Sequence, residues 1–158
     1  MAADLDPVDL RILALLLEDG RASATVIADK VGLSRPAVAD RIEKLERHGV
    51  IRGYTVVADP KSVGKGVTAF VAARKAEGLD AKARKAFVQL MASEQILEAH
   101  SVAGEDCYLL KVRTDDINSL SSVLNHLTTP PLSFTTRTTI VLETHCEKVG
   151  GINLGERS

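Results

Sequence analysis

The first 49 residues carry three pairs of helix start and stop signals, and no other feature of the chain limits its fold as strongly. Asp and Ser cap helix N-termini, Pro suits the first helical turn, and Gly ends a helix in a left-handed conformation. The start signals are Asp6-Pro7, Ser23 and Ser34, and the stop signals are Gly20, Gly32 and Gly49. Between them apolar residues recur at helical spacing, which predicts three short helices around one small core.

The second and third predicted helices, residues 24–31 and 35–48, are separated by a turn of a few residues. This is the spacing of a helix-turn-helix, whose second helix enters the major groove of DNA with its N-terminal residues near base edges. The residues at that end are Ser34, Arg35, Pro36, Ala37 and Asp40.

The third predicted helix has charges of opposite sign on its two flanks. At about 100° per residue, Val38, Ile42 and Leu45 form a buried stripe. Arg41 and Lys44 lie on one flank with Ala37 and His48, Glu43 and Glu46 lie on the other, and Arg47 lies opposite the core. DNA repels carboxylates, so only the basic flank can face it. The candidate phosphate contacts are Arg35, Arg41, Lys44 and Arg47, and Glu43 is placed to pair with Arg47 one turn on.

Composition does not favour nucleic-acid binding. The chain has a formal net charge of −1, and residues 1–60 hold eight Lys and Arg against ten Asp and Glu. A DNA-binding surface therefore requires the positive charges to be gathered on one face. The alternative is a surface helix whose mixed charges serve solubility.

The rest of the chain predicts an α+β protein with a second domain. Residues 50–60 are rich in β-branched residues and predict a hinge strand, and the glycines of residues 61–66 predict a linker. The pattern then becomes βαββαβ, the ferredoxin-like order. We expect a helix-turn-helix domain of the winged type at 1–53, a hinge strand and linker at 54–66, a ferredoxin-like domain at 67–148 and a poorly ordered tail at 149–158. The predicted strands are 68–76, 96–103, 107–114 and 133–144, and the predicted helices follow Asp80 and Asp116.

Several functional classes have no support in the sequence. No apolar run approaches the roughly 20 residues of a membrane span, and the acidic N-terminus is unlike a signal peptide, so we expect a cytoplasmic protein with no membrane partner. Cys107 and Cys146 lack metal-ligand spacing, so neither a metal nor a cofactor is expected. Cys107 is interpreted as a small hydrophobe rather than a redox switch. The four His residues form no Ser/His/Asp set, so an enzyme is not expected.

Four segments resemble the Lrp/AsnC, or feast/famine, family of transcription regulators. They are LDPVDLRILALLLEDGRAS, DKVGLSRPAVADRIEKLERHGVIRGYTVVADP, SVAGEDCYLLKVRT and TRTTIVLE. They occur in the order and at the separations typical of the family, and the resemblance covers residues 5 to about 147. It implies an N-terminal helix-turn-helix, a hinge strand and a C-terminal domain that dimerises through its sheet and often assembles further into octamers.

The resemblance also implies an effector, usually an amino acid, bound between dimers of the C-terminal domain. The residues implied are Ala103, Gly104, Glu105 and Asp106 of a glycine loop, with Thr136 and Thr138 of the last strand. Backbone N–H groups at such a loop suit a carboxylate, and Glu105 or Asp106 suits an ammonium group. Two departures from the family pattern occur, Cys107 in place of Asp and Pro130-Pro131-Leu132 in place of Pro-Gly-Val. The alternative is a plain hairpin turn beside a β-branched strand.

Two functions follow from these patterns. The first is a transcription regulator that binds pseudo-palindromic double-stranded DNA as a homo-oligomer and responds to an amino acid. The second is an amino-acid-sensing regulatory subunit that docks on a partner enzyme, which the net acidic charge of residues 1–60 favours. The operator, the effector, activation versus repression, and dimer versus octamer are left open by the sequence.

Overall fold

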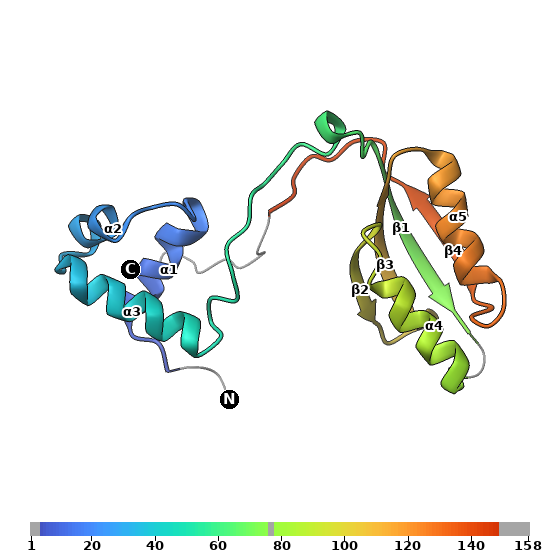
Figure 1. The fold of residues 1–158 in the computed structure, drawn as a ribbon, viewed down its shortest axis with the longest axis horizontal. Coiled ribbons are helices and arrows are strands. Elements are labelled where there is room, and N and C mark those ends of the chain that lie inside the picture. The colour runs from blue at the N-terminus through green and yellow to red at the C-terminus, as the bar shows by residue number, and fades with distance from the viewer. Residues whose placement is uncertain (1–3, 76–77, 149–158) are drawn as a thin grey trace. The chain divides into compact units, whose positions relative to one another are not determined.

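The computed structural model describes residues 4–75 and 78–148, which fold into two compact units (Figure 1). Of the described residues, the first unit comprises those up to Val57 together with Glu147 and Lys148, and the second comprises Ala58–Cys146. Each unit has its own cluster of buried residues. The tail expected at 149–158 lies outside the described residues.

The first unit consists of the three predicted helices, α1 (Pro7–Glu18), α2 (Ala24–Val31) and α3 (Arg35–Arg47). Each begins where its capping side chain accepts a hydrogen bond from the backbone N–H three residues further on. The caps are Asp6, Ser23 and Ser34, as predicted. Gly32 and Gly49 adopt φ values of 71° and 69°, the left-handed conformation expected after a helix. The core consists of Ile12, Leu13, Ile27, Ala28, Val38, Leu45 and Ile51.

The strand predicted between residue 50 and the Asp59-Pro60 break is not paired within the described chain. Between α3 and the first strand, the described residues form only one short 3-10 helix, η1 (Lys61–Val63). Val56 and Val57 are 86% and 73% exposed. Their β-branched side chains favour an extended backbone, but a strand also needs a neighbour to complete its hydrogen bonds, and no other described segment pairs with them.

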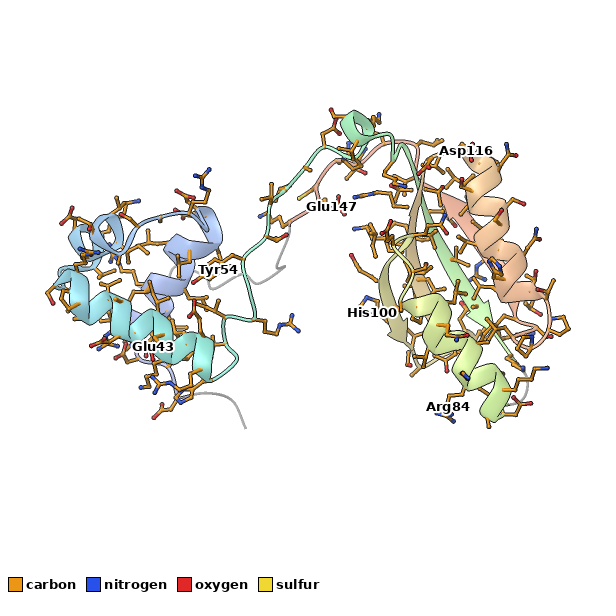
Figure 2. The ribbon with its side chains drawn as sticks, viewed as in Figure 1. Glu43, Tyr54, Arg84, His100, Asp116 and Glu147 are labelled. Atoms are coloured by element: carbon orange, nitrogen blue, oxygen red, sulfur yellow. The ribbon has the colours of Figure 1, made fainter. Side chains whose placement is uncertain are left out.

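The second unit has the predicted βαββαβ order. Its elements are β1 (Val67–Arg74), α4 (Ala81–Met91), β2 (Ile96–Ser101), β3 (Tyr108–Thr114), α5 (Ile117–Thr128) and β4 (Thr135–Ile140). The strands form an antiparallel sheet in the order β2-β3-β1-β4, which confirms the ferredoxin-like arrangement (Figure 1). Asp116, labelled in Figure 2, begins α5 by accepting from the backbone N–H of Ser119 at 2.7 Å, a bond that lowers its pKa.

The last strand is shorter than the predicted residues 133–144. At its start, the backbone N–H of Phe134 donates to the carbonyl of Leu127 in α5 rather than to a strand. At its end, the backbone N–H of Val141 makes the last ladder-like bond, to Thr68 near the start of β1. Because β1 begins at Val67, which the register places opposite Leu142, residues beyond Leu142 run past its end.

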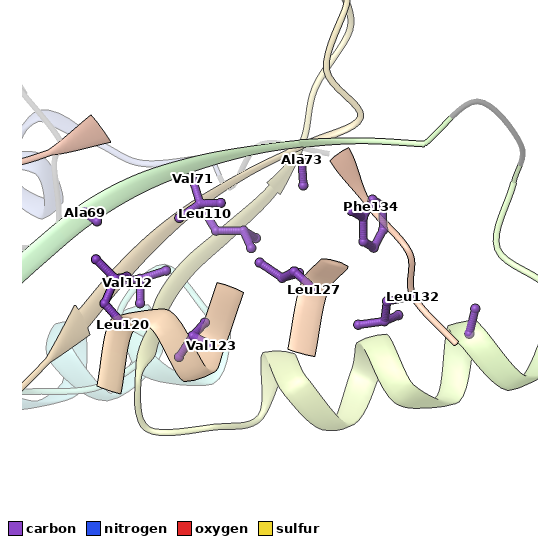
Figure 3. Packing of buried hydrophobic residues seen from close by; sticks show 11 residues of the cluster. Ala69, Val71, Ala73, Leu110, Val112, Leu120, Val123, Leu127, Leu132 and Phe134 are labelled. Atoms are coloured by element: carbon purple, nitrogen blue, oxygen red, sulfur yellow. The ribbon is translucent and has the colours of Figure 1, made fainter. Parts of the chain in front are cut away.

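Helices α4 and α5 cover one face of the sheet and enclose its core (Figure 3). From β1, the side chains of Ala69, Val71 and Ala73 point into this core and are fully buried. Leu110 and Val112 of β3 meet Leu120, Val123 and Leu127 of α5 there. The opposite face carries the alternate residues of each strand.

Among the described residues, no helix combines the length and the apolar character needed to cross a membrane.

Candidate nucleic-acid interface and ligand site

Helix α3 packs its predicted stripe inward and leaves most of its polar residues in solvent. Val38 and Leu45 are 0% and 2% exposed, and Ile42 is half-buried. The predicted base-proximal residues lie at the accessible start of the helix, although Ala37 is half-buried. The Ser34 hydroxyl is used within the helix, where it accepts from the backbone N–H of Ala37 at 3.4 Å.

The acidic flank of α3 is occupied by partners from its own unit. The hydroxyl of Tyr54 donates to Glu46 at 2.9 Å, and partial burial together with this carboxylate raises the Tyr54 pKa to about 12. Glu43 pairs with Arg47 at 3.8 Å, which confirms the predicted contact. Both side chains of that pair are well exposed, and such pairs contribute about 0–1 kcal/mol, so Arg47 can leave Glu43 at little cost.

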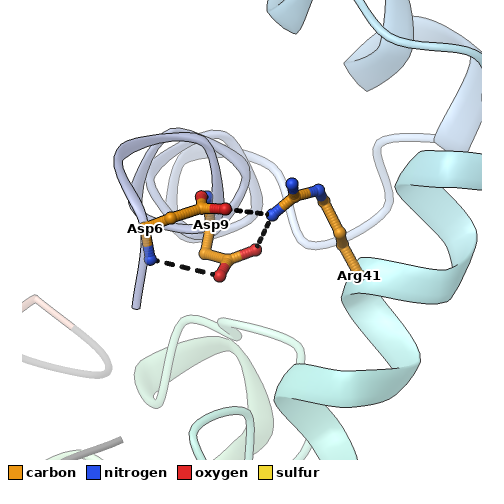
Figure 4. Close-up of polar contacts among 3 residues, drawn as sticks. All are labelled: Asp6, Asp9 and Arg41. Atoms are coloured by element: carbon orange, nitrogen blue, oxygen red, sulfur yellow. Dashed lines mark hydrogen bonds and ion pairs between the residues drawn. The ribbon is translucent and has the colours of Figure 1, made fainter. Parts of the chain in front are cut away.

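Arg41 does not share the exposed environment of Lys44. Its Nη1 atom lies 2.6 Å from Oδ2 of Asp6 and 2.6 Å from Oδ1 of Asp9, both at the start of α1 (Figure 4). The pKa of Arg41 is raised, first by its hydrogen bond to Asp6 and to a lesser extent by its hydrogen bond to Asp9. The backbone N–H of Asp9 and then the Arg41 guanidinium lower the pKa of Asp6. From the sequence, Arg41 is predicted to contact phosphates together with Arg35, Lys44 and Arg47. In the structure its guanidinium instead binds two carboxylates.

The positive charge that remains available on α3 comes from Arg35 and Lys44. Both are exposed, and neither forms an ion pair with any residue that the structure describes. With the weakly paired Arg47, they leave three cations on the helix surface while Glu46 and Arg41 are engaged inside the unit.

The glycine loop is fixed to the end of β1. Gly104 has a φ of 143°, a backbone conformation that residues other than glycine rarely adopt. The N–H of Val102 donates to the carbonyl of Cys107 at 3.0 Å, and the N–H of Cys107 donates to the carbonyl of Ala73 at 3.0 Å. Ala103 and Glu105 are exposed on this loop. Cys107 is half-buried, and its Sγ lies 3.6 Å from the carbonyl of Lys75.

The residue of β4 that reaches this loop is Arg137. Its Nη2 lies 3.0 Å from Oδ2 of Asp106. Thr136 and Thr138 stand opposite Ala73 and Val71 in the sheet register, so their half-buried side chains lie on the helix-covered face. The structure therefore brings Asp106 together with Arg137 and not with the two threonines. The sequence held a signal for this arrangement. Phe134 is a large apolar residue, and residues of a strand alternate between its two faces, so Arg137, three residues later, is expected on the face opposite to Phe134.

No cluster of three or more His, Cys, Asp or Glu side chains placed for a metal ion occurs in the described ranges 4–75 and 78–148.

Two protein families match this chain, and together they span most of it. Residues 5–52 match a family described as winged helix-turn-helix DNA-binding. Residues 68–150 match the Lrp/AsnC ligand binding domain. The first match covers the three helices, and the second covers the ferredoxin-like sheet with its glycine loop.

Individual relatives match along nearly their whole length. The HTH-type transcriptional regulator FL11 of Pyrococcus abyssi is 33% identical over 93% of this chain and 95% of its own. The crystal structure of the leucine response regulatory protein LrpA of Mycobacterium tuberculosis has a TM-score of 0.78 and 33% identity, covering 91% of this chain and 97% of its own. A Neisseria meningitidis transcriptional regulator, described as a complex with L-Met, has a TM-score of 0.78 and 26% identity, covering 92% and 94%. The chain belongs to the Lrp/AsnC family of DNA-binding transcription regulators with a ligand-binding domain.

Proposed function

We propose that this chain binds operator DNA as a dimer or a larger homo-oligomer through the exposed surface of α3. The observation that carries the proposal is a pair of exposed cations, Arg35 and Lys44, on the second helix of a helix-turn-helix. Neither cation has an ion-pair partner among the described residues. They are placed to contact phosphates together with Arg47. Because Glu46 is bound by Tyr54, the acidic flank has an internal partner and is not directed to DNA.

Base recognition falls to the start of α3. Of its residues, Asp40 has an exposed carboxylate, which can accept a hydrogen bond from the amino group of cytosine. Ser34 has its hydroxyl in the helix cap, and Pro36 and Ala37 offer no side-chain hydrogen bonds. Direct readout is therefore modest, and DNA shape and binding through several copies of the chain supply much of the specificity.

Selection of bound fragments from a random-sequence DNA pool tests this function. Two copies related by a two-fold axis read the same bases in opposite directions, so the enriched fragments should contain inverted half-sites. The half-sites should be separated by about one helical turn, 10–10.5 base pairs, or a multiple of it. A pool in which no sequence is enriched would contradict sequence-specific recognition by α3.

For the ligand, we propose an amino acid held by the Gly104 loop and the Asp106–Arg137 pair. The match to the Lrp/AsnC ligand binding domain and the neighbour described with L-Met support this choice. An amino acid carries an ammonium and a carboxylate group, and Asp106 and Arg137 are charged to receive them. Ala103, Gly104 and Glu105 contribute the loop. Thr136 and Thr138, whose side chains lie on the helix-covered face, flank Arg137 in β4 and support its position.

Thermal unfolding measured with each common amino acid, beginning with L-methionine, tests this ligand site. A ligand that binds only the folded protein stabilises it by about 2.7 kcal/mol at a concentration of 100 Kd, so one amino acid should raise Tm by several degrees. Arg137→Ala should abolish the rise, and Thr138→Ala should keep most of it. A panel without any rise at millimolar concentrations would count against an amino-acid ligand.

A further inference from the structure

The contact between α3 and the start of α1 is a closed polar network. Asp6 and Asp9 form a reciprocal capping box, in which the N–H of Asp9 donates to Oδ1 of Asp6 at 2.7 Å and the N–H of Asp6 donates to Oδ2 of Asp9 at 3.3 Å. Arg41 donates to the two oxygens that the box leaves over, Oδ2 of Asp6 and Oδ1 of Asp9 (Figure 4). All four carboxylate oxygens therefore have a partner. We refer to these three residues as the Asp6-Asp9-Arg41 clamp.

The clamp is anchored inside the unit. Asp9 is 3% exposed, although an ionised Asp is rarely buried unless it is paired. The core contacts of α3 with α1 and α2 are apolar and include Val38 and Leu45. A further polar contact outside the helix, that of Glu46 with Tyr54, is to a residue that follows α3 in the chain and not to α1 or α2. Apolar contacts have no direction, whereas hydrogen bonds to two fixed carboxylates define the rotation and the position of a helix along its axis.

Arg41 also lies between the two cations proposed to contact DNA. It stands six residues after Arg35 and three before Lys44, which corresponds to about 9 Å and 4.5 Å along the helix axis. A shift of α3 against α1 would move both cations relative to the rest of the unit.

We infer that Arg41 is a positioning residue: the Asp6-Asp9-Arg41 clamp fixes the orientation of α3 that DNA binding requires, and Arg41 itself does not contact DNA. This inference rests on the proposed function of α3. It differs from the sequence-based interpretation, in which Arg41 is one of the phosphate contacts.

Replacement of Asp9 by asparagine distinguishes a positioning role of the clamp from an effect of net charge, because the two predict changes in DNA affinity of opposite sign. Asp9 is too buried to touch DNA. Asp9→Asn removes one negative charge and releases Arg41 from one partner, and both changes favour binding to a polyanion on charge alone. The asparagine side-chain oxygen can still accept from Asp6, so the helix cap is retained. If the clamp positions α3, affinity should fall instead.

The experiment uses the full chain and a labelled duplex carrying inverted half-sites selected from a random pool. Affinity is measured over a range of salt concentrations for the wild type, Asp9→Asn and Arg41→Gln, and each value is corrected for the folded fraction from circular dichroism. We expect both variants to bind roughly tenfold more weakly, the size typical of coupling within one polar network, with the slope of log affinity against log salt unchanged. Asp29→Asn is the matched control, because it removes an exposed carboxylate of α2, and it should bind at least as tightly as the wild type.

Three results would overturn the inference. The first is a folded Asp9→Asn that binds as tightly as the wild type or more tightly. The second is an Arg41→Gln slope that is shallower by about 0.9 for each side chain lost, which would mean that Arg41 neutralises a phosphate. The third is an Arg41→Gln protein with lowered Tm whose folded fraction has unchanged affinity, since the clamp would then be only structural. A wild type that fails to bind DNA would defeat the proposed function itself, and that failure is visible before any variant is compared.

Discussion

The double variant Arg35→Ala/Lys44→Ala is expected to bind DNA about a thousandfold more weakly than the wild type at roughly 0.1 M salt. In a dimer it removes four side chains that neutralise phosphates, and each such contact contributes about 0.9 to the slope of log affinity against log salt. Both residues are exposed and without an ion pair among the described residues, so the free energy of unfolding should change by less than about 0.5 kcal/mol for each substitution. A filter-binding or anisotropy titration measures the loss.

The control variant Lys82→Ala/Lys85→Ala removes the same number of charges from α4. These lysines are exposed in the second unit and form no ion pair with a described residue. Their loss should change DNA affinity by less than about tenfold, because charges outside the proposed DNA-binding surface of α3 act only through the net charge. Equal losses for the two double variants would show that affinity follows total charge and not the surface of α3.

Leu127→Ala should lower the free energy of unfolding of the second unit by about 3 kcal/mol. Leu127 is 0% exposed and packs in the core between α5 and the sheet (Figure 3). Removing a fully buried leucine side chain loses its transfer free energy and leaves a cavity, at a total cost of about 2–5 kcal/mol. Hydrogen exchange should show faster exchange in β1, β3 and β4, with little change in α1, α2 and α3, since the first unit has its own core.

Val88→Ala is the matched control for this substitution. Val88 lies on α4 and is 62% exposed, so its replacement should change stability by less than about 0.5 kcal/mol. A Leu127→Ala protein as stable as this control would contradict the packing of α5 on the sheet.

The helix ends could be predicted because the signals act over short distances. The side chains of Asp6, Ser23 and Ser34 each bind a backbone N–H three residues away. The left-handed Gly32 and Gly49 stand at the ends of α2 and α3, whereas α1 ends at an extended Asp19 and Gly20 is not left-handed. The βαββαβ order could be predicted for the same reason, because the apolar pattern changes between a helical and a two-residue period from one element to the next. These features depend on neighbouring residues alone.

The partner of Arg41 could not be predicted from helical spacing. A helical projection shows which side chains share a flank of α3, but Asp6 and Asp9 lie 35 and 32 residues earlier in the chain. Only the packing of α1 against α3 brings them to the guanidinium. The spacing of Asp6 and Asp9 as a capping box at the start of α1 is visible in the sequence. Their contact with Arg41 is not.

The pairing of the expected strand and the face on which the expected ligand threonines lie both depend on more than the local sequence. Thr55, Val56 and Val57 have strand-forming side chains, yet strand pairing is decided by a neighbour elsewhere in the chain or in another chain. The predicted ligand residues Thr136 and Thr138 have the right hydroxyls, yet a shift of one position along β4 exchanges the two faces of the sheet. Arg137 is on the face that reaches Asp106.

The dependence of DNA affinity on salt tests most directly the claim that α3 presents phosphate-binding cations. For a dimer using Arg35, Lys44 and Arg47, the slope of log affinity against log salt should be about −5, a loss of roughly a thousandfold between about 50 and 200 mM. The Arg35→Ala/Lys44→Ala variant, left with Arg47 alone, should have a slope of about −2. A slope near zero for the wild type, or the same slope for both proteins, would contradict the assignment. A module that docks on another protein would show no such salt-dependent DNA binding at all.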